Sequence, residues 1–337
     1  MAMLSSLSVV SNQTPIGEYI MAHMVETMAY AGELPWHGLG TEVSNDLTPV
    51  QMMQKAGVDW KVHEVESFIE FNGKKVKTGQ KSLVRETDGK ILTNVGENWH
   101  PLQNEQAFEF FNEYVLAGDM EMHTAGSLKG GQYVWALAKV KESFDLFGGD
   151  QVDSYFLFSN PHVYGKSIDV RFTPIRVVCN NTLTFALNSQ ADRAVKVGHR
   201  TAFDADSVKT TLGIAHEKFA KYKEMAQFLG SKRFSVESLL QYYNEVFPLT
   251  SGQDKQTEVT KDTISRMALQ SLDVLETQPG AEFAEGTWWQ AFNSVTFVTD
   301  HLQGRNADNR LHSQWFGQNQ LRKIKAAEKA VEFALAA

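Results

Sequence analysis

Alternating apolar and polar residues through the first half of the chain predict a series of strands. In residues 168–172, three apolar side chains alternate with Asp169 and Arg171, the period-two pattern of a strand with one solvated face. Because alternate side chains of a strand point to opposite faces, we expect Asp169 and Arg171 to share a face. Residues 155–158 are apolar throughout and predict a buried strand just before them.

Glycine-containing turns separate the predicted strands. Asn-Gly at residues 72–73 and Asp-Gly at residues 88–89 are typical of hairpin turns. Lys-Gly-Gly at residues 129–131 and the segment 160–165, which begins Asn-Pro and ends in Gly, separate further strands. A short strand is also expected within residues 193–203.

Helical patterns interrupt and then replace the strands. Residues 48–57 begin with Thr-Pro and end with Gly, which predicts a short helix capped by Thr48. Residues 104–118 predict an amphipathic helix with Asn104 as its N-cap, and a long helix is expected after Asp204.

This order predicts an α+β fold with a curved antiparallel sheet crossed by helices, followed by a mainly helical C-terminal region. We expect a loosely structured N-terminal extension over residues 1–33. The α+β core with a basic strand-helix block covers residues 34–235, and the helical region covers residues 236–337.

Composition is that of an ordinary globular protein, with 42% hydrophobic and 21% charged residues among 337. The sequence has no apolar run long enough for a membrane helix and no clear secretory signal, so no membrane partner is expected. Cys179 is the single cysteine, which excludes an intrachain disulfide and predicts a reducing, cytoplasmic location.

Charge is distributed unevenly, although the net charge is −8. Residues 160–235 contain 12 Lys and Arg against 6 Asp and Glu, whereas residues 236–299 contain 3 against 9. Such a basic block indicates either an anionic partner or neutralisation by acidic segments that pack beside it in the fold.

Motifs for catalysis are missing or incomplete. Residues 160–167, NPHVYGKS, end like a phosphate-binding loop, but Asn160 stands where that loop needs its first glycine. Cys179 lies in an apolar stretch without an evident base, so we expect a structural role for its thiol. No metal-binding pattern is recognisable, and no cofactor is expected.

Four segments, in this order, carry a resemblance: PWHGLGTEV, NEQAFEFFNEYV, FTPIRVVCNNTLTFAL and TWWQAFNSVTFVTDHLQGRNADNRLHSQWFGQNQLRKIKA. Together they resemble the phage/plasmid-like protein family, domain of unknown function 932, over residues 34 to 330. One departure is the longer turn at residues 162–167, with an added lysine. The resemblance implies a link with mobile DNA in a bacterial host cell.

By analogy with ring-forming single-strand annealing proteins, the resemblance favours a protein that binds single-stranded DNA without nucleotide hydrolysis. Such a protein is expected to work as a homo-oligomer, in a ring or a filament. Cations that neutralise phosphates and amides that contact bases or phosphates are the chemistry required. The candidate DNA-binding residues are Lys166, Arg171, Arg176, Asn180, Asn181, Thr182, Arg193, Lys196 and Arg200, with Tyr164 and Phe203 as possible stacking residues.

Two other functions stay open. The chain could be an enzyme acting on a nucleotide or nucleic acid, or a structural scaffold. The enzyme pocket would be built from Trp36, His37, Asn180, Asn181, Thr182, Asp300 and His301. A competing structural interpretation pairs Arg171 with Asp169 and Arg176 with Asp192 on a solvated sheet face, while residues 180–182 cap a turn.

Overall fold

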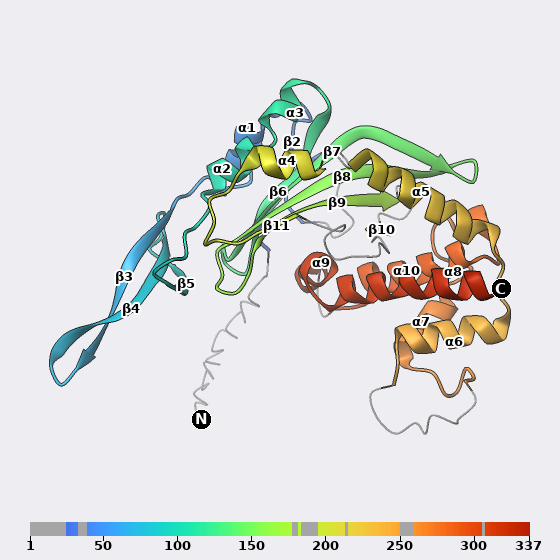
Figure 1. Ribbon diagram of the computed structural model, residues 1–337. Coiled ribbons are helices and arrows are strands. Elements are labelled where there is room, and N and C mark those ends of the chain that lie inside the picture. The colour runs from blue at the N-terminus through green and yellow to red at the C-terminus, as the bar shows by residue number, and fades with distance from the viewer. Residues whose placement is uncertain are drawn as a thin grey trace, which may run out of the picture.

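The structure is a computed structural model that describes residues 25–32, 39–176, 181–182, 195–212, 215–249, 259–304 and 307–337. Its strands form a large sheet and a separate three-stranded sheet, and a helical region follows them (Figure 1). The strands are β1 (Val25–Ala31), β2 (Thr41–Val43), β3 (Val62–Phe71), β4 (Lys74–Arg85), β5 (Ile91–Gly96), β6 (Met120–Leu128), β7 (Tyr133–Leu146), β8 (Asp150–Pro161), β9 (Ile168–Arg176), β10 (Asn181–Thr182) and β11 (Val195–Val197).

Helices lie between the strands and dominate the last third of the chain. The first group is α1 (Pro49–Lys55), α2 (Asn104–Glu109), α3 (Asn112–Leu116), α4 (Ala205–Leu212) and α5 (Ala215–Ser231). The C-terminal group is α6 (Val236–Val246), α7 (Arg266–Asp273), the 3-10 helix η2 (Ala281–Ala284), α8 (Trp288–Phe297), the π-helical turn η3 (Val298–Leu302), α9 (Ala307–Phe316) and α10 (Gln318–Ala336).

The large sheet has the strand order β10-β9-β8-β7-β6-β1-β2, and β11 also pairs with β9. All its pairs are antiparallel except the parallel pair β1–β2. This arrangement confirms the predicted α+β fold with a mainly antiparallel sheet and a helical C-terminal region. Among the described residues, no helix is both long and apolar enough to cross a membrane.

The expectation of loose structure near the N-terminus is wrong for β1. Residues 25–31 pair with β6 on one side and β2 on the other, and Met28 to Ala31 are buried. The segment VETMAYA has no β-branched residue after Val25 and Thr27, so its propensity for a strand is weak. Burial of Met28 and Tyr30 against the other strands therefore decides its conformation.

Hairpin turns form where glycine dipeptides predict them. Asn72 and Gly73 have φ angles of 50° and 70°, the left-handed conformations that the β3–β4 hairpin turn requires. A second turn at residues 86–90 joins β4 to β5, so one continuous strand, β4, serves both hairpins. Helix α1 also begins as predicted, because Thr48 and Gln51 form a capping box in front of it.

The helix predicted over residues 104–118 is divided into α2 and α3, and its cap is Gln103 rather than Asn104. Asn104 is buried and uses its side chain for tertiary contacts. Its Nδ2 donates to the Val58 carbonyl oxygen at 2.9 Å. Its Oδ1 accepts from Asn160 Nδ2 at 3.1 Å and lies 3.0 Å from His162 Nε2. A capping role was the wrong interpretation because this amide is needed inside the core.

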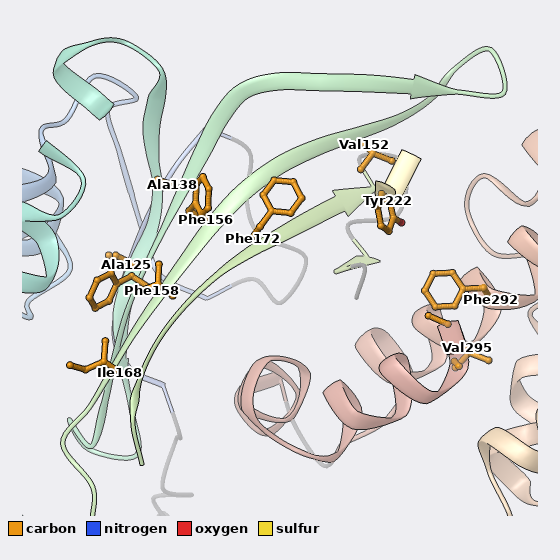
Figure 2. Packing of buried hydrophobic residues seen from close by; sticks show 14 of the residues in the cluster. Ala125, Ala138, Val152, Phe156, Phe158, Ile168, Phe172, Tyr222, Phe292 and Val295 are labelled. Carbon is orange, nitrogen blue, oxygen red and sulfur yellow. The ribbon is translucent and has the colours of Figure 1, made fainter. Parts of the chain in front are cut away.

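The two faces of the large sheet bury different residues. On one face, apolar side chains of β6 to β9 join a cluster that continues into the helices (Figure 2). In that cluster Phe156 and Phe172 come from the sheet, Tyr222 from α5 and Phe292 from α8. One apolar core therefore extends from the sheet into the C-terminal region.

The opposite face of the sheet is covered by α9. Trp135, Tyr155 and Leu157 pack there in a cluster with Leu311 and Trp315. The rings of Trp135 and Trp315 meet edge to face with centroids 5.7 Å apart. The central strands β7 and β8 are thus buried on both faces.

Replacing Gly126 with alanine should destabilise the protein. The added Cβ would lie 2.3 Å from the Thr27 carbonyl oxygen and 2.5 Å from the Trp135 ring, so β1 or Trp135 must move. Overpacking of this kind costs about 1–3 kcal/mol. Gly96→Ala is the matched control, because its Cβ would meet no atom within 4 Å. Denaturant unfolding should show a lower midpoint for Gly126→Ala alone; equal midpoints for the two variants would contradict this close approach.

The free energy of unfolding should decrease on acidification from pH 7 to pH 5, before the carboxylates titrate. Burial lowers the pKa of His162 to about 3, so the folded protein keeps this imidazole neutral. As the pH falls below about 6.5, the unfolded chain binds a proton that folded His162 excludes, which costs about 2 kcal/mol by pH 5. Thermal melting between pH 7 and pH 5 measures the loss, and NMR of the His162 ring should show it unprotonated. A melting temperature that is constant over this range would contradict the prediction.

Candidate nucleic-acid interface

Four basic residues lie at the end of the large sheet where the β6–β7 and β8–β9 turns are found. Pairing of Tyr133 with Pro161 brings these two turns together, and pairing of Val197 with Ile168 brings the end of β11 to the same place. We call this set the basic end; it consists of Lys129, Lys166, Lys196 and Arg200. The last three are exposed and were predicted from the sequence, whereas Lys129 was not.

Positive charges at the basic end lie close enough to affect each other's protonation. Burial, followed by the charge of Lys166, lowers the pKa of Lys129. Burial, followed by the charges of Lys129 and Lys166, lowers the pKa of His312 in α9 to about 4. No carboxylate in the described part of the chain forms an ion pair with any member of the basic end. The site is therefore arranged to favour an anion.

Aromatic rings accompany these cations. Lys129 Nζ lies 5.2 Å from the centroid of the Tyr133 ring, which stacks on Phe316 of α9 at 5.8 Å. His312 meets the same tyrosine ring edge-on at 5.4 Å. Tyr164, in the turn that holds Lys166, is 60% exposed. Tyr133 itself is buried, so Tyr164 is the ring that a ligand can reach. Cations near an accessible ring are the combination that single-stranded nucleic acids require.

The turn before β7 is conformationally unusual. Lys129, Gly130 and Gly131 have φ angles of 53°, 66° and 86°, and such values are uncommon for a residue with a side chain. A Cβ at Gly131 would lie 2.9 Å from Arg85 Nη1 and 3.3 Å from the Trp60 ring. Close packing against the base of the β3–β4 hairpin therefore requires this backbone path, which aims Lys129 at Tyr133.

Part of the basic block is neutralised by acidic neighbours, as the alternative interpretation of its charge predicts. Lys209 of α4 contacts Glu113 of α3 and lies 3.8 Å from Asp206. The contact with Glu113 raises the pKa of Lys209. This part of the block therefore differs from the basic end, for which the described residues show no such ion pair; Asp169, which stands opposite Lys196 in the β9–β11 register, pairs with Arg171.

Arg171 is engaged in an ion pair. Its Nε donates to Asp169 Oδ1 at 2.6 Å, and its Nη1 donates to the Trp315 carbonyl oxygen at 3.3 Å. The two charged side chains are only 14% and 10% exposed, beneath α9 instead of on a solvated face. This geometry favours the pairing of Arg171 with Asp169 over a role for Arg171 in phosphate contact.

A second buried pair lies close to the first. Lys323 of α10 donates to Asp300 Oδ1 at 2.8 Å, and both side chains are almost completely buried. Burial lowers the pKa of Lys323; Asp300 opposes this, and the nearby charge of Arg171 adds to it. We call Asp169, Arg171, Asp300 and Lys323 the buried charge network. It joins β9 to the π-helical turn η3 and to α10.

The remaining candidates are placed only in part. Arg176 pairs with Asn181, and Ile175 with Thr182, so β9 ends at Arg176 and β10 returns along it, against α8. His301 lies with its ring 4.8 Å from Phe297. Five predicted residues lie outside the described residues: Trp36, His37, Cys179, Asn180 and Arg193. Asp192, the expected partner of Arg176, lies outside them too.

Sequence reasoning missed Lys129, His312 and Phe316. A lysine within Lys-Gly-Gly is read as part of a turn, and only the pairing of β7 with β8 shows that Lys166 stands beside it. The sequence places His312 in a mainly helical region. The helical pattern around His312 does not indicate which strand that helix covers.

Comparison with known proteins identifies a family. Residues 91–316 match the family model described as Domain of unknown function (DUF932). No curated protein and no solved structure matches the chain. The match includes the whole basic end and three members of the buried charge network, and it carries no statement about phages or plasmids. Because it covers about two thirds of the chain, the protein belongs to the DUF932 family.

Proposed function

We propose that the protein binds single-stranded DNA at the basic end, as a strand-binding or annealing protein that works without nucleotide hydrolysis. One observation carries the proposal: Lys129 and Lys166 lie close together without a carboxylate partner within the described structure, and the exposed ring of Tyr164 belongs to the turn that holds Lys166. Phosphates supply the missing negative charge, and exposed rings offer stacking surfaces to bases.

Electrostatic repulsion within the basic end supports a polyanion over a single small anion. Lys129 and Lys166 oppose each other's charge, and Lys196 and Arg200 stand on the neighbouring strand β11 and just after it. Successive phosphates of a nucleic acid can neutralise several such cations together and release their counterions. An anion bound there would favour the charged form of Lys129, whose pKa is lowered by burial and by the charge of Lys166.

The enzyme alternative receives less support from the geometry. Asp300 was one residue of its suggested pocket, but the carboxylate of Asp300 accepts a hydrogen bond from buried Lys323. Such a buried pair holds elements together, and a free acid or base in contact with substrate would need access to it. The oligomeric state of the DNA-binding form remains part of the proposal.

Removing cations of the basic end should weaken DNA binding in a salt-dependent way. Lys166→Ala, Lys196→Ala and Arg200→Ala should each lower affinity for single-stranded DNA of any sequence. Each should also reduce the slope of log affinity against log salt by about 0.7 per lost phosphate contact. Fluorescence anisotropy with a labelled oligonucleotide, repeated over a salt series, measures both quantities. Lys261→Ala, at an exposed lysine of the C-terminal region, is the control that should leave both unchanged.

Duplex DNA and single-stranded RNA of the same sequence complete the comparison. Tighter binding to the duplex would contradict the single-strand assignment. An affinity that does not depend on salt concentration, or three variants that all bind like the wild type, would remove the basic end from the interface.

Arg171→Ala should behave differently from these variants. Its loss leaves the carboxylate of Asp169 almost buried without its partner, and breaking a buried pair costs about 3–5 kcal/mol. The melting temperature should fall, while the protein that remains folded binds DNA with wild-type affinity. Measuring both on one preparation separates the two roles. A stable variant with weakened binding would return Arg171 to the interface.

A further inference from the structure

The three-stranded sheet β3-β4-β5 has one face that packs on the core and one that does not. Leu83 of β4 and Val95 of β5 are buried in the core on the first face. We call the second the open face; much of it belongs to the β3–β4 hairpin, which projects from the body of the protein as an arm (Figure 1). Strand register and alternation place on the open face His63, Val65, Ser67, Ile69 and Phe71 of β3, Lys74, Val76, Ser82 and Val84 of β4, and Ile91 and Asn94 of β5.

A row of polar side chains crosses the middle of the open face. Ser67 Oγ lies 2.8 Å from Ser82 Oγ, and Ser82 Oγ lies 2.8 Å from Asn94 Oδ1, to which it donates. These contacts join β3, β4 and β5 on one side of the sheet, which agrees with the register. The three side chains bond to one another, so the row needs no partner from outside.

Apolar side chains lie on both sides of this polar row. We call the set toward the end of the arm the tip group, which consists of Ile69, Phe71 and Val76, and the set toward the body the base group, which consists of Val65, Val84 and Ile91. Ile69 and Phe71 are 54% and 64% exposed, and Val65 and Ile91 are 47% and 60% exposed. The solvated face of an antiparallel sheet is normally polar, so an apolar face of this extent indicates contact with another molecule.

The charged side chains of the arm are gathered on its other face. There Lys77 pairs with Glu66 at 2.5 Å, and Lys75 covers Phe68 with Nζ 4.2 Å from the ring centroid. Of the Asp, Glu, Lys and Arg residues in β3, β4 and β5, all of which the structure describes, Lys74 alone lies on the open face. The open face is therefore built for apolar contact.

Positions along β3 are symmetric about Ser67. Val65 and Ile69 lie two residues to either side of it, and His63 and Phe71 lie four residues to either side. A two-fold axis that crosses the strands at Ser67 therefore places Ile69 of one copy over Val65 of another, and Phe71 over His63. The tip group of each copy then covers the base group of the other.

Opposite charges stand at the two ends of the open face. Lys74 is opposite Phe71 at the tip, and Glu86 Oε1 lies 3.4 Å from His63 Nε2 at the base. The same two-fold axis brings Lys74 of each copy to the end where Glu86 of the other lies. Apolar contact in the middle with complementary charges at the rim is the usual arrangement of a protein interface.

We propose that two copies of this chain bind each other through their open faces, as a two-fold dimer with the arms packed face to face and antiparallel. Sheets that pack in this way lie about 10 Å apart, with apolar side chains between them. A face about 33 Å long and about 14 Å wide, three strands across, buries on the order of 1,000 Å² in such a dimer. This area is at the low end for specific interfaces, so we expect a dissociation constant in the micromolar range.

A second copy fits the open face better than a nucleic acid does. Phosphates require several cations, and this face offers Lys74 alone. The match of tip group to base group about Ser67 is used fully only by a partner with the same surface. A contact of this kind closes on itself, so it forms a dimer and does not propagate. The inference concerns assembly and is independent of DNA binding at the basic end.

Sedimentation velocity of the full chain without nucleic acid, over a micromolar concentration series, provides the first test. The wild type should show an equilibrium between monomer and dimer. Ile69→Ser/Phe71→Ser should weaken dimerisation about tenfold or more. Phe68→Ser is the matched control, because Phe68 is an exposed ring on the other face of the same arm and its loss should leave dimerisation unchanged. Circular dichroism and melting confirm that each variant is folded.

A charge exchange tests the two-fold geometry. Lys74→Glu and Glu86→Lys should each weaken dimerisation about threefold, because each places like charges at both ends of the dimer. An equal mixture of these two variants should recover the wild-type affinity, since opposite charges meet at both ends of the mixed dimer. A mixture that associates no more tightly than either variant alone would overturn the antiparallel arrangement.

The proposal as a whole has clear contrary results. A wild type that stays monomeric throughout the series, or a Phe68→Ser variant that weakens dimerisation as much as Ile69→Ser/Phe71→Ser, would overturn it. A monomeric wild type whose affinity for single-stranded DNA, or for vesicles of anionic phospholipid, falls in Ile69→Ser/Phe71→Ser would assign the open face to that ligand instead.

Discussion

Burial of both faces of the central strands is the constraint on which the rest of this structure depends. Strands β7 and β8 carry apolar side chains on each face, so neither face can remain in water. One face packs in a cluster that includes residues of α1, α2, α5 and α8. The other face packs against α9, including Trp315. The C-terminal helices are therefore part of the same core as the sheet, and the connection from α8 must bring the chain around to the opposite face.

That passage explains the buried charge network. The chain crosses from α8 to α9 through the π-helical turn η3, where the regular hydrogen-bond ladder changes. Asp300 in this turn forms an ion pair with Lys323, and Asp169 on β9 forms one with Arg171. Charges at such a depth are tolerated only as pairs, so they fix the position of η3 and α10 relative to the sheet.

Much of the fold is readable from the sequence, because local chemistry decides it. Glycine turns, the Thr48 cap and the strand alternation around Asp169 all specify structure over a few residues. Long-range packing decides the remainder. Asn104 is not the expected N-cap because its amide makes hydrogen bonds inside the core. The pair of Arg171 and Asp169 is buried, not solvated, because α9 covers that face of β9. Lys129 belongs to the basic end because distant turns meet, which no local pattern encodes.

The place of β1 in the sheet has a consequence for the order in which the chain acquires its structure during synthesis. Strands β6 to β9 pair with their neighbours in sequence and can form as soon as they leave the ribosome. Strand β1 is made first, yet it must wait for β6, with all of α1–α3 and the three-stranded sheet made in between. Until the two meet, the outer edge of β6 is an open template for another chain. The first strand of the described structure is thus a late addition to its largest sheet.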